Sequence, residues 1–329
     1  EGDVVGGAAV LARSDKDGGT DPYYQLAAAA VLERAGDPRG IERYEAAVAL
    51  APDLAPAEML LARLLLLERG AEAAKPVLES LRKKTGDTPS TRALSALSWV
   101  VSHNRPDELP SEAQLQPGDV EKLPAPLAAV PAMVDAAKAL NKQDLPAASK
   151  AIDSAIPLAM TPALAAGLGF LAIEAGDEVV ARKAALRALQ FSGVYPQART
   201  LAARVALLGG RIDEAQKAIE GLDPASADVA VVRAVVAYES LETADLKTAL
   251  EALGNSAVGS AFSGLEAAPG VISGTAFPAP TALEEMAAPE KPWGELVAID
   301  AAIETGNLPL AEKILSKRSL ETLRPVHLR

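Results

Sequence analysis

The stretch that decides the fold is GGRIDEAQKAIEGLDP, residues 209–224. A glycine pair is followed by a short acidic run, then by a small and a larger apolar residue four positions apart, and finally by a proline. We interpret this pattern as the end of one helix, a tight turn and a second helix. Gly210 would close the first helix, Ala215 and Ile219 would face it, and Pro224 would end the second helix.

Turns of this kind recur along the chain with a period of about 34 residues. A small residue follows each turn by four or five positions, and in most copies a larger apolar residue stands one helical turn further on. A small residue beside a large one lets two helices interlock. The turns are centred on Gly36, Gly70, Asn104, Gln143, Gly176, Gly210, Ala244 and Gly306. The sequence therefore predicts a repeat of helix pairs.

This period and pattern resemble the tetratricopeptide repeat (TPR) family, as a divergent bacterial member. Leu168 and Gly169 match the family's Leu-Gly pair, and the family's alanine is matched by Ala181, Ala215 and Ala311. The large aromatic residues of the family's first helix are mostly replaced here by alanine, valine or leucine. The resemblance implies an all-α, right-handed superhelical solenoid of seven to eight helix-turn-helix units, whose concave face is lined by first helices and binds peptides or protein segments.

Two stretches interrupt the repeat. Prolines in 104–126 rule out a regular second helix there, so the third repeat should keep only its first helix, about 89–103. Residues 254–292 form a Gly/Ser/Pro-rich insertion with a short helix expected near 281–287; it is either a disordered linker or, because of its apolar residues, partly packed on the solenoid. The expected organisation is a remnant helix (4–13) and flexible loop in 1–22, TPR-like repeats in 23–103 and 127–253, a last repeat in 293–320, and a tail, 321–329.

The composition limits the partners. Acidic residues outnumber basic ones 44 to 32, for a net charge of −12, which disfavours nucleic acid. There is no cysteine, which excludes disulfides and thiolate chemistry and slightly favours an extracytoplasmic place, periplasmic or outer-membrane-associated, over the cytoplasm.

The chain starts at Glu1 without a leader pattern, and we interpret it as a processed form or a fragment. The uncharged stretch 154–173 is long enough to span a bilayer, but Pro157 and Pro162 favour two helices instead.

Residues for catalysis are not arranged in a recognisable motif. The two histidines, His103 and His327, are far apart in the sequence, and no nucleophile elbow, zinc-binding or phosphate-loop motif is present. The adjacent carboxylates Glu284 and Glu285 are typical of a solvated helix face. We expect no enzyme activity, no cofactor and no metal.

A partner site is expected on the first helices, at the positions that the resemblance places in the concave groove. These positions lack the lysine and asparagine ladder with which some family members hold a carboxylate, and they are largely apolar. An apolar or amphipathic segment is therefore the expected ligand. Alternatively, these side chains pack internally, or the insertion fills the groove. The candidate binding residues are Leu60, Leu64, Met133, Phe170, Arg204 and Tyr238.

These features favour a non-catalytic scaffold or adaptor that binds a protein segment within a bacterial multiprotein assembly. The alternative is a regulatory or substrate-recruiting region of a larger enzyme whose catalytic domain lies outside this chain.

Overall fold

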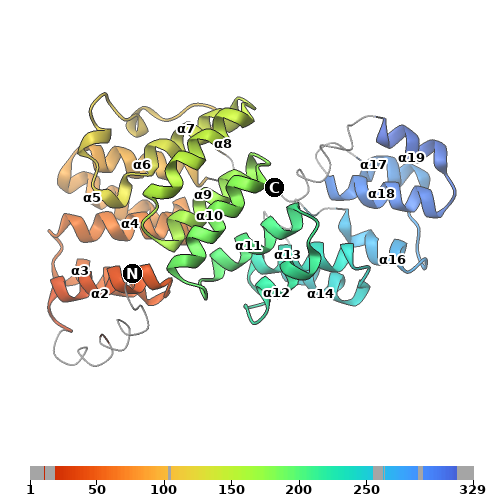
Figure 1. Cartoon of the computed structure of the whole chain (residues 1–329), viewed down its shortest axis with the longest axis horizontal. Coiled ribbons are helices and arrows are strands. Elements are labelled where there is room, and N and C mark those ends of the chain that lie inside the picture. Colours follow the sequence, from red (N-terminus) through yellow and green to blue (C-terminus); the bar gives the residue numbers. More distant parts are fainter. Residues whose placement is uncertain are drawn as a thin grey trace. The chain divides into compact units, whose positions relative to one another are not determined.

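A computed structural model describes residues 11, 19–102, 105–254, 262, 264–287 and 292–316 of the chain. All regular structure in these ranges is helical, which confirms the all-α repeat fold (Figure 1). The α-helices are α2 (Pro22–Ala35), α3 (Arg39–Leu50), α4 (Ala55–Arg69), α5 (Ala71–Thr85), α6 (Pro89–Val100), α7 (Val130–Asn141), α8 (Leu145–Ala155), α9 (Pro162–Glu174), α10 (Glu178–Phe191), α11 (Pro196–Leu208), α12 (Ile212–Ile219), α13 (Ala227–Glu239), α14 (Thr243–Leu253), α16 (Ala268–Ile272), α17 (Pro280–Met286), α18 (Pro292–Glu304) and α19 (Leu308–Leu315). Five 3-10 helices join them: η1 (Ser111–Ala113), η2 (Val120–Lys122), η3 (Ala125–Leu127), η4 (Ile156–Leu158) and η5 (Leu265–Ala267).

Six of the turns within helix pairs share one backbone geometry. In each, a residue with positive φ donates its N–H to the carbonyl three residues earlier, and the next residue bonds the carbonyl five residues earlier, which satisfies the carbonyls at the end of the first helix. The positive-φ residues are Gly36, Gln143, Gly176, Gly210, Leu241 and Gly306. One shared turn explains why the sequence repeats with a nearly constant period.

The turn predicted at Ala244 is wrong by three residues. Leu241 takes the left-handed position with φ 58°, and Ala244 lies in the first turn of α14. A leucine there gives no sequence signal, because glycine or asparagine normally holds this conformation. Leu246, fully buried five residues after Leu241, takes the position that alanine holds in the neighbouring repeats.

Contacts between Cα atoms divide the chain into two units, which we describe separately: unit 1 up to Leu201 and unit 2 from Ala202. Unit 1 contains the pairs α2–α3, α4–α5, α7–α8 and α9–α10, together with α6, which lacks a second helix. The predicted first helix at 89–103 is thus present as α6, and short 3-10 turns follow it where a second helix would stand.

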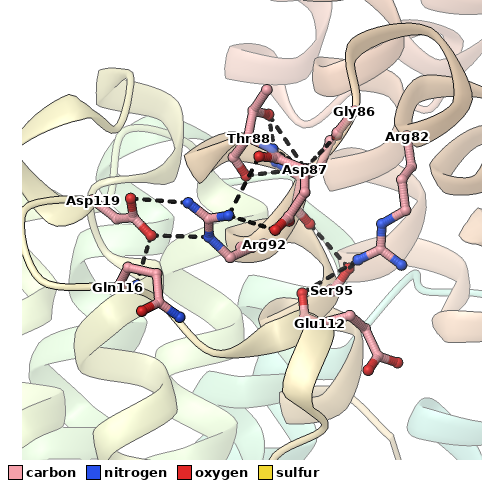
Figure 2. A network of polar contacts seen from close by, with 10 residues as sticks. Arg82, Gly86, Asp87, Thr88, Arg92, Ser95, Glu112, Gln116 and Asp119 are labelled. Carbon is pink, nitrogen blue, oxygen red and sulfur yellow. Dashed lines mark hydrogen bonds and ion pairs between the residues drawn. The ribbon is translucent and has the colours of Figure 1, made fainter.

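An ion pair anchors this irregular segment to α6 (Figure 2). The Arg92 guanidinium donates to both carboxylate oxygens of Asp119, at 2.9 and 3.0 Å, and also reaches Asp87. The Gln116 backbone N–H donates to the same Asp119 carboxylate at 2.6 Å. These hydrogen bonds, those from Arg92 above all, hold the pKa of Asp119 below its usual range. The segment is therefore held as a defined layer rather than a free loop.

Unit 1 departs from a linear solenoid because α9 contacts α2 and α4 as well as its sequence neighbours. Two glycines of α9 allow the neighbouring helices to approach it closely. A Cβ on Gly167 would lie 3.5 Å from Leu67 of α4 and 3.6 Å from Met133 of α7, and one on Gly169 would overlap the Leu201 side chain at 2.2 Å. The Gly169 of the family's Leu-Gly pair is thus explained by the close approach of α11.

Unit 2 contains the end of α11 and the helices from α12 to α19, around one apolar cluster. The short helix predicted near 281–287 is present as α17. In the described part of the insertion, Phe262, Leu265, Val271 and Leu283 are buried in this cluster. That part is therefore packed, as one of the two alternatives from the sequence expected.

Several expectations fall outside the described residues: most of the helix at 4–13 and the loop after it, His103, His327 and the tail 321–329. The uncharged stretch 154–173 is divided among the end of α8, η4 and α9. None of the described helices is both long enough and apolar enough to cross a bilayer.

Candidate functional site

The face predicted to bind a partner in unit 1 is largely filled by the protein itself. Leu64 is 4% exposed and Met133 is 1% exposed, because α9 lies over the first helices that carry them. Both side chains therefore belong to the core in this structure. The reason is the contact of α9 with α2 and α4, which joins repeats that are distant in the sequence and leaves no trace in the repeat pattern.

In unit 2, Tyr238 packs against α18 and is 9% exposed. The Trp293 indole lies edge-on to its ring, with centroids 5.9 Å apart, and Phe262 stacks on the indole at 5.3 Å. The Tyr238 hydroxyl donates a hydrogen bond to Asp300. Desolvation raises the pKa of Asp300, although this hydrogen bond opposes the shift. Tyr238 is thus a packing residue here.

The other three candidates, Leu60, Phe170 and Arg204, are half-buried. The first two belong to unit 1 and Arg204 to unit 2. Binding of a partner at any of them stays a prediction.

A buried polar cluster in unit 1 is structural in character. The Arg63 guanidinium forms an ion pair with Glu33, and both side chains are almost fully buried. Tyr44 donates to the same carboxylate at 2.8 Å, and Arg63 also donates to the Pro126 carbonyl at 3.3 Å. The cluster joins α2, α3, α4 and the irregular segment. It adjoins a cavity of about 120 Å³, which has room for only a few waters.

The larger hollow lies in unit 2, over α13 and between α12 and the start of α14. Its volume is about 860 Å³, within the usual range for ligand sites. We call it the α13 groove and define it by its lining residues. They are Asp213, Gln216, Lys217, Ile219, Glu220, Gly221, Leu222, Pro224, Val229, Arg233, Val236, Ala237, Ser240, Glu242 and Asp245.

The groove follows from helix geometry. Val229, Arg233, Val236 and Ala237 of α13, and Ser240 just after its end, are spaced so that they lie in a stripe along one side of the helix. The apolar members of this stripe are buried and form the floor, whereas Arg233 and Ser240 are exposed at the edge. The site is therefore a hollow with a narrow apolar floor and a wider polar rim.

The early end of α12 leaves the space open. We predicted that the second helix would continue to Pro224, and this is wrong: α12 has 8 residues and ends at Ile219, whereas the corresponding α10 has 14 and α14 has 11. Gly221, in the left-handed region with φ 76°, turns the chain away just after the helix. A signal was present, since a glycine two residues past an apolar position is typical of a helix C-terminus.

The chemistry of the groove is that of a binding surface. Its rim carries the carboxylates Asp213, Glu220, Glu242 and Asp245 and the cations Lys217 and Arg233. In the described ranges, no group of three or more histidine, cysteine, aspartate or glutamate residues could hold a metal ion. The groove therefore offers an apolar floor and charged edges to a ligand with both kinds of side chain.

Compared by sequence, the chain matches no protein family and no curated protein. Among solved structures it is similar to the crystal structure of the P58(IPK) TPR domain, at 13% identity and a TM-score of 0.32, over 99% of this chain and 90% of that one. The repeat fold described above rests on the helix pairs and their shared turn.

Proposed function

We propose that this protein is a non-catalytic scaffold or adaptor that holds a segment of another protein, and that the segment binds in the α13 groove. Stacked helix pairs bury a continuous core and leave extended surfaces for recognition. The observation that carries the proposal is the open hollow of about 860 Å³ with an apolar floor and a charged rim. Such a combination suits a peptide, whose apolar side chains anchor it while its backbone and charges meet the rim.

The groove is preferred to the first-helix face because its edge is accessible. Lys217 and Arg233 are exposed at the rim, whereas Leu64 and Met133 are in the core of unit 1. A partner could reach the α13 groove without moving a helix. To reach Leu64 or Met133 it would have to displace α9.

The proposal is tested by site-specific photo-cross-linking in extracts of the native host. A photoreactive residue is placed at Lys217, on the groove rim, and for comparison at Lys247, an exposed lysine on α14 outside the groove. A second change, Ser240→Trp, fills the exposed end of the groove without altering the core. We expect protein adducts at position 217 that are lost with Ser240→Trp and absent at position 247. Equal labelling at 217 and 247, unaffected by Ser240→Trp, would overturn the proposal.

A further inference from the structure

The charges of the α13 groove are distributed unevenly along its length. Helices α12 and α13 are successive and packed together, so the start of α12 lies beside the end of α13, where α14 also begins. Three carboxylates gather at this end, from Asp213 on α12 and from Glu242 and Asp245 at the start of α14. Within the described residues, none of the three has an ion-pair or hydrogen-bond partner for its side chain.

Two exposed carboxylates elsewhere in the chain are paired with a lysine of another helix. Asp153 of α8 meets Lys183 of α10 at 2.9 Å, and Glu284 of α17 meets Lys313 of α19 at 3.0 Å. The three unpaired carboxylates at one end of the groove therefore form a local excess of negative charge. Such an excess attracts a cation from a ligand.

The opposite end of the groove is more apolar and carries a single carboxylate. Ile219, Leu222 and Val229 line it, beside Glu220 and Pro224, where the chain leaves α12 and enters α13. Between the two ends stand Lys217 and Arg233, whose positive charges disfavour a second cation in the middle of a ligand. The groove therefore has a direction, from a more apolar end with one carboxylate to an acidic end with three.

We propose that the occupant is a segment of another protein with apolar residues at one end and lysine or arginine at the other. This assignment rests on the proposed function of the groove. The stripe from Val229 to Ser240 covers eleven helical steps, or about 16 Å. An extended peptide covers that length with about five residues. The motif is thus a short apolar–basic segment.

Two dye-labelled peptides serve as probes, Leu-Leu-Ser-Ser-Lys-Arg and the matched Leu-Leu-Ser-Ser-Glu-Glu. Binding to the full chain is measured by fluorescence anisotropy at low and at physiological salt. We expect the apolar–basic peptide to bind about tenfold more tightly, as expected for a few exposed charge pairs acting together, with the difference shrinking as salt is added.

Two triple variants separate a local effect from one of net charge. The groove variant is Asp213→Asn, Glu242→Gln, Asp245→Asn. The control, Glu251→Gln, Glu285→Gln, Glu304→Gln, neutralises three exposed carboxylates of unit 2 outside the groove. We expect about tenfold weaker binding of the apolar–basic peptide to the groove variant, and an unchanged affinity for the control. Equal weakening by both variants would overturn the proposal, because the preference would then reflect net charge alone.

The remaining outcomes separate this inference from the proposed function. Equal binding of both peptides overturns the charge assignment and leaves the function in place.

If neither peptide binds the full chain, a chain ending at Ser316 is tested, because residues 317–329 contain Lys317, Arg318, Arg324 and Arg329 beside several leucines. Binding only after this truncation would identify the occupant as the chain's own segment and overturn the proposal of an external partner. No binding in either form also overturns it, and cross-linking at Lys217 then decides separately whether the groove binds protein at all.

Discussion

The hydroxyl of Tyr195 donates a hydrogen bond to the carboxylate of Glu68, 127 residues earlier in the chain. Gln197 donates to the other oxygen of this carboxylate at 2.7 Å, and the Tyr195 ring lies against Gly36. Together with the contacts of α9 with α2 and α4, these interactions join the first repeats of unit 1 to its last. In a linear solenoid each repeat contacts only its neighbours and can unfold separately. Unit 1 should instead unfold as one cooperative body.

This closure can be followed separately from unit 2, because the chain has two tryptophans and each unit contains one. Trp99 lies on α6 in unit 1, and Trp293 lies on α18 in unit 2. Denaturation of a Trp293→Phe chain, followed by fluorescence, therefore reports the free energy of unfolding of unit 1. A Trp99→Phe chain reports that of unit 2.

The first prediction concerns Gly36→Ala. A Cβ at this position would lie 2.7 Å from the Tyr195 ring, and φ is +68°. The matched control is Gly306→Ala, at φ +71° in the same kind of turn, where a Cβ would meet no atom within 4 Å. We expect Gly306→Ala to lower the stability of unit 2 by about 1–2 kcal/mol, the cost of the left-handed conformation. Gly36→Ala should lower the free energy of unfolding of unit 1 by about 1–3 kcal/mol more than this, because the added Cβ overlaps the Tyr195 ring. Equal losses for the two variants would show that Tyr195 does not restrict the space at Gly36.

The second prediction is a pH dependence from Glu68. Burial raises the pKa of this carboxyl above its ordinary value of 4.5, although the hydrogen bonds from Tyr195 and Gln197 oppose the shift. The folded state therefore binds the proton more tightly than the unfolded state. The stability that this contributes is present below pH 4.5 and is lost as the pH rises through the folded-state pKa.

We expect Glu68→Gln to remove this loss of stability at high pH, because glutamine does not ionise. The free energies of unfolding of the variant and of the native chain should then be similar at low pH and differ once the pH exceeds the folded-state pKa of Glu68. Tyr195→Phe removes a hydrogen bond that lowers the pKa of Glu68, and should extend the window of lost stability to higher pH. Denaturation curves of unit 1 at several pH values test both changes. A constant difference between the Glu68→Gln variant and the native chain across this range would contradict the account.

The third prediction concerns the buried pair of Arg63 and Glu33. Arg63→Met leaves the Glu33 carboxylate buried, with the Tyr44 hydroxyl still donating to it. We expect a loss of about 3–5 kcal/mol, typical when one member of a buried ion pair is removed. Adding Glu33→Gln removes the charge and should recover a large part of the loss, since a neutral amide is easier to bury. A double variant no more stable than Arg63→Met alone would show that the pair matters through shape and not through charge.

The fourth prediction tests how the irregular segment is held. Arg92 contacts two carboxylates, Asp119 at 6% side-chain exposure and Asp87 at 65%. We expect Asp119→Asn to speed amide hydrogen exchange over 111–127 by about tenfold, because the anchor to α6 is lost and the segment opens locally. Asp87→Asn keeps that anchor and should leave exchange there nearly unchanged. If the two variants behaved alike, the Arg92–Asp119 contact would not be what orders the segment.

Most of the helix positions could be predicted from the sequence, because they depend on local chemistry. The turn glycines, the small-large pairs after them and the prolines of 104–126 all act within one helix pair. The turn at Leu241 and the early end of α12 also have local causes. Leucine rarely takes a positive φ, and Gly221 ends the helix before Pro224 is reached.

The binding surface could not be predicted in the same way. Whether Met133 or Tyr238 faces a groove depends on α9 and α18, which are supplied by distant parts of the chain. The α13 groove depends on a helix, α12, that is one to two turns shorter than α10 and α14, and the repeat pattern predicts equal lengths. The repeat determines which helices pair, whereas its irregularities determine where a surface stays open.

The most direct test of the central claim is hydrogen–deuterium exchange of the full chain with and without the apolar–basic peptide. We predict that bound peptide slows exchange in 212–222 and 227–245, which line the α13 groove, and leaves α9, Pro162–Glu174, unchanged. Protection of α9 and α4 with none around α13 would contradict the account. It would place the partner on the first-helix face of unit 1.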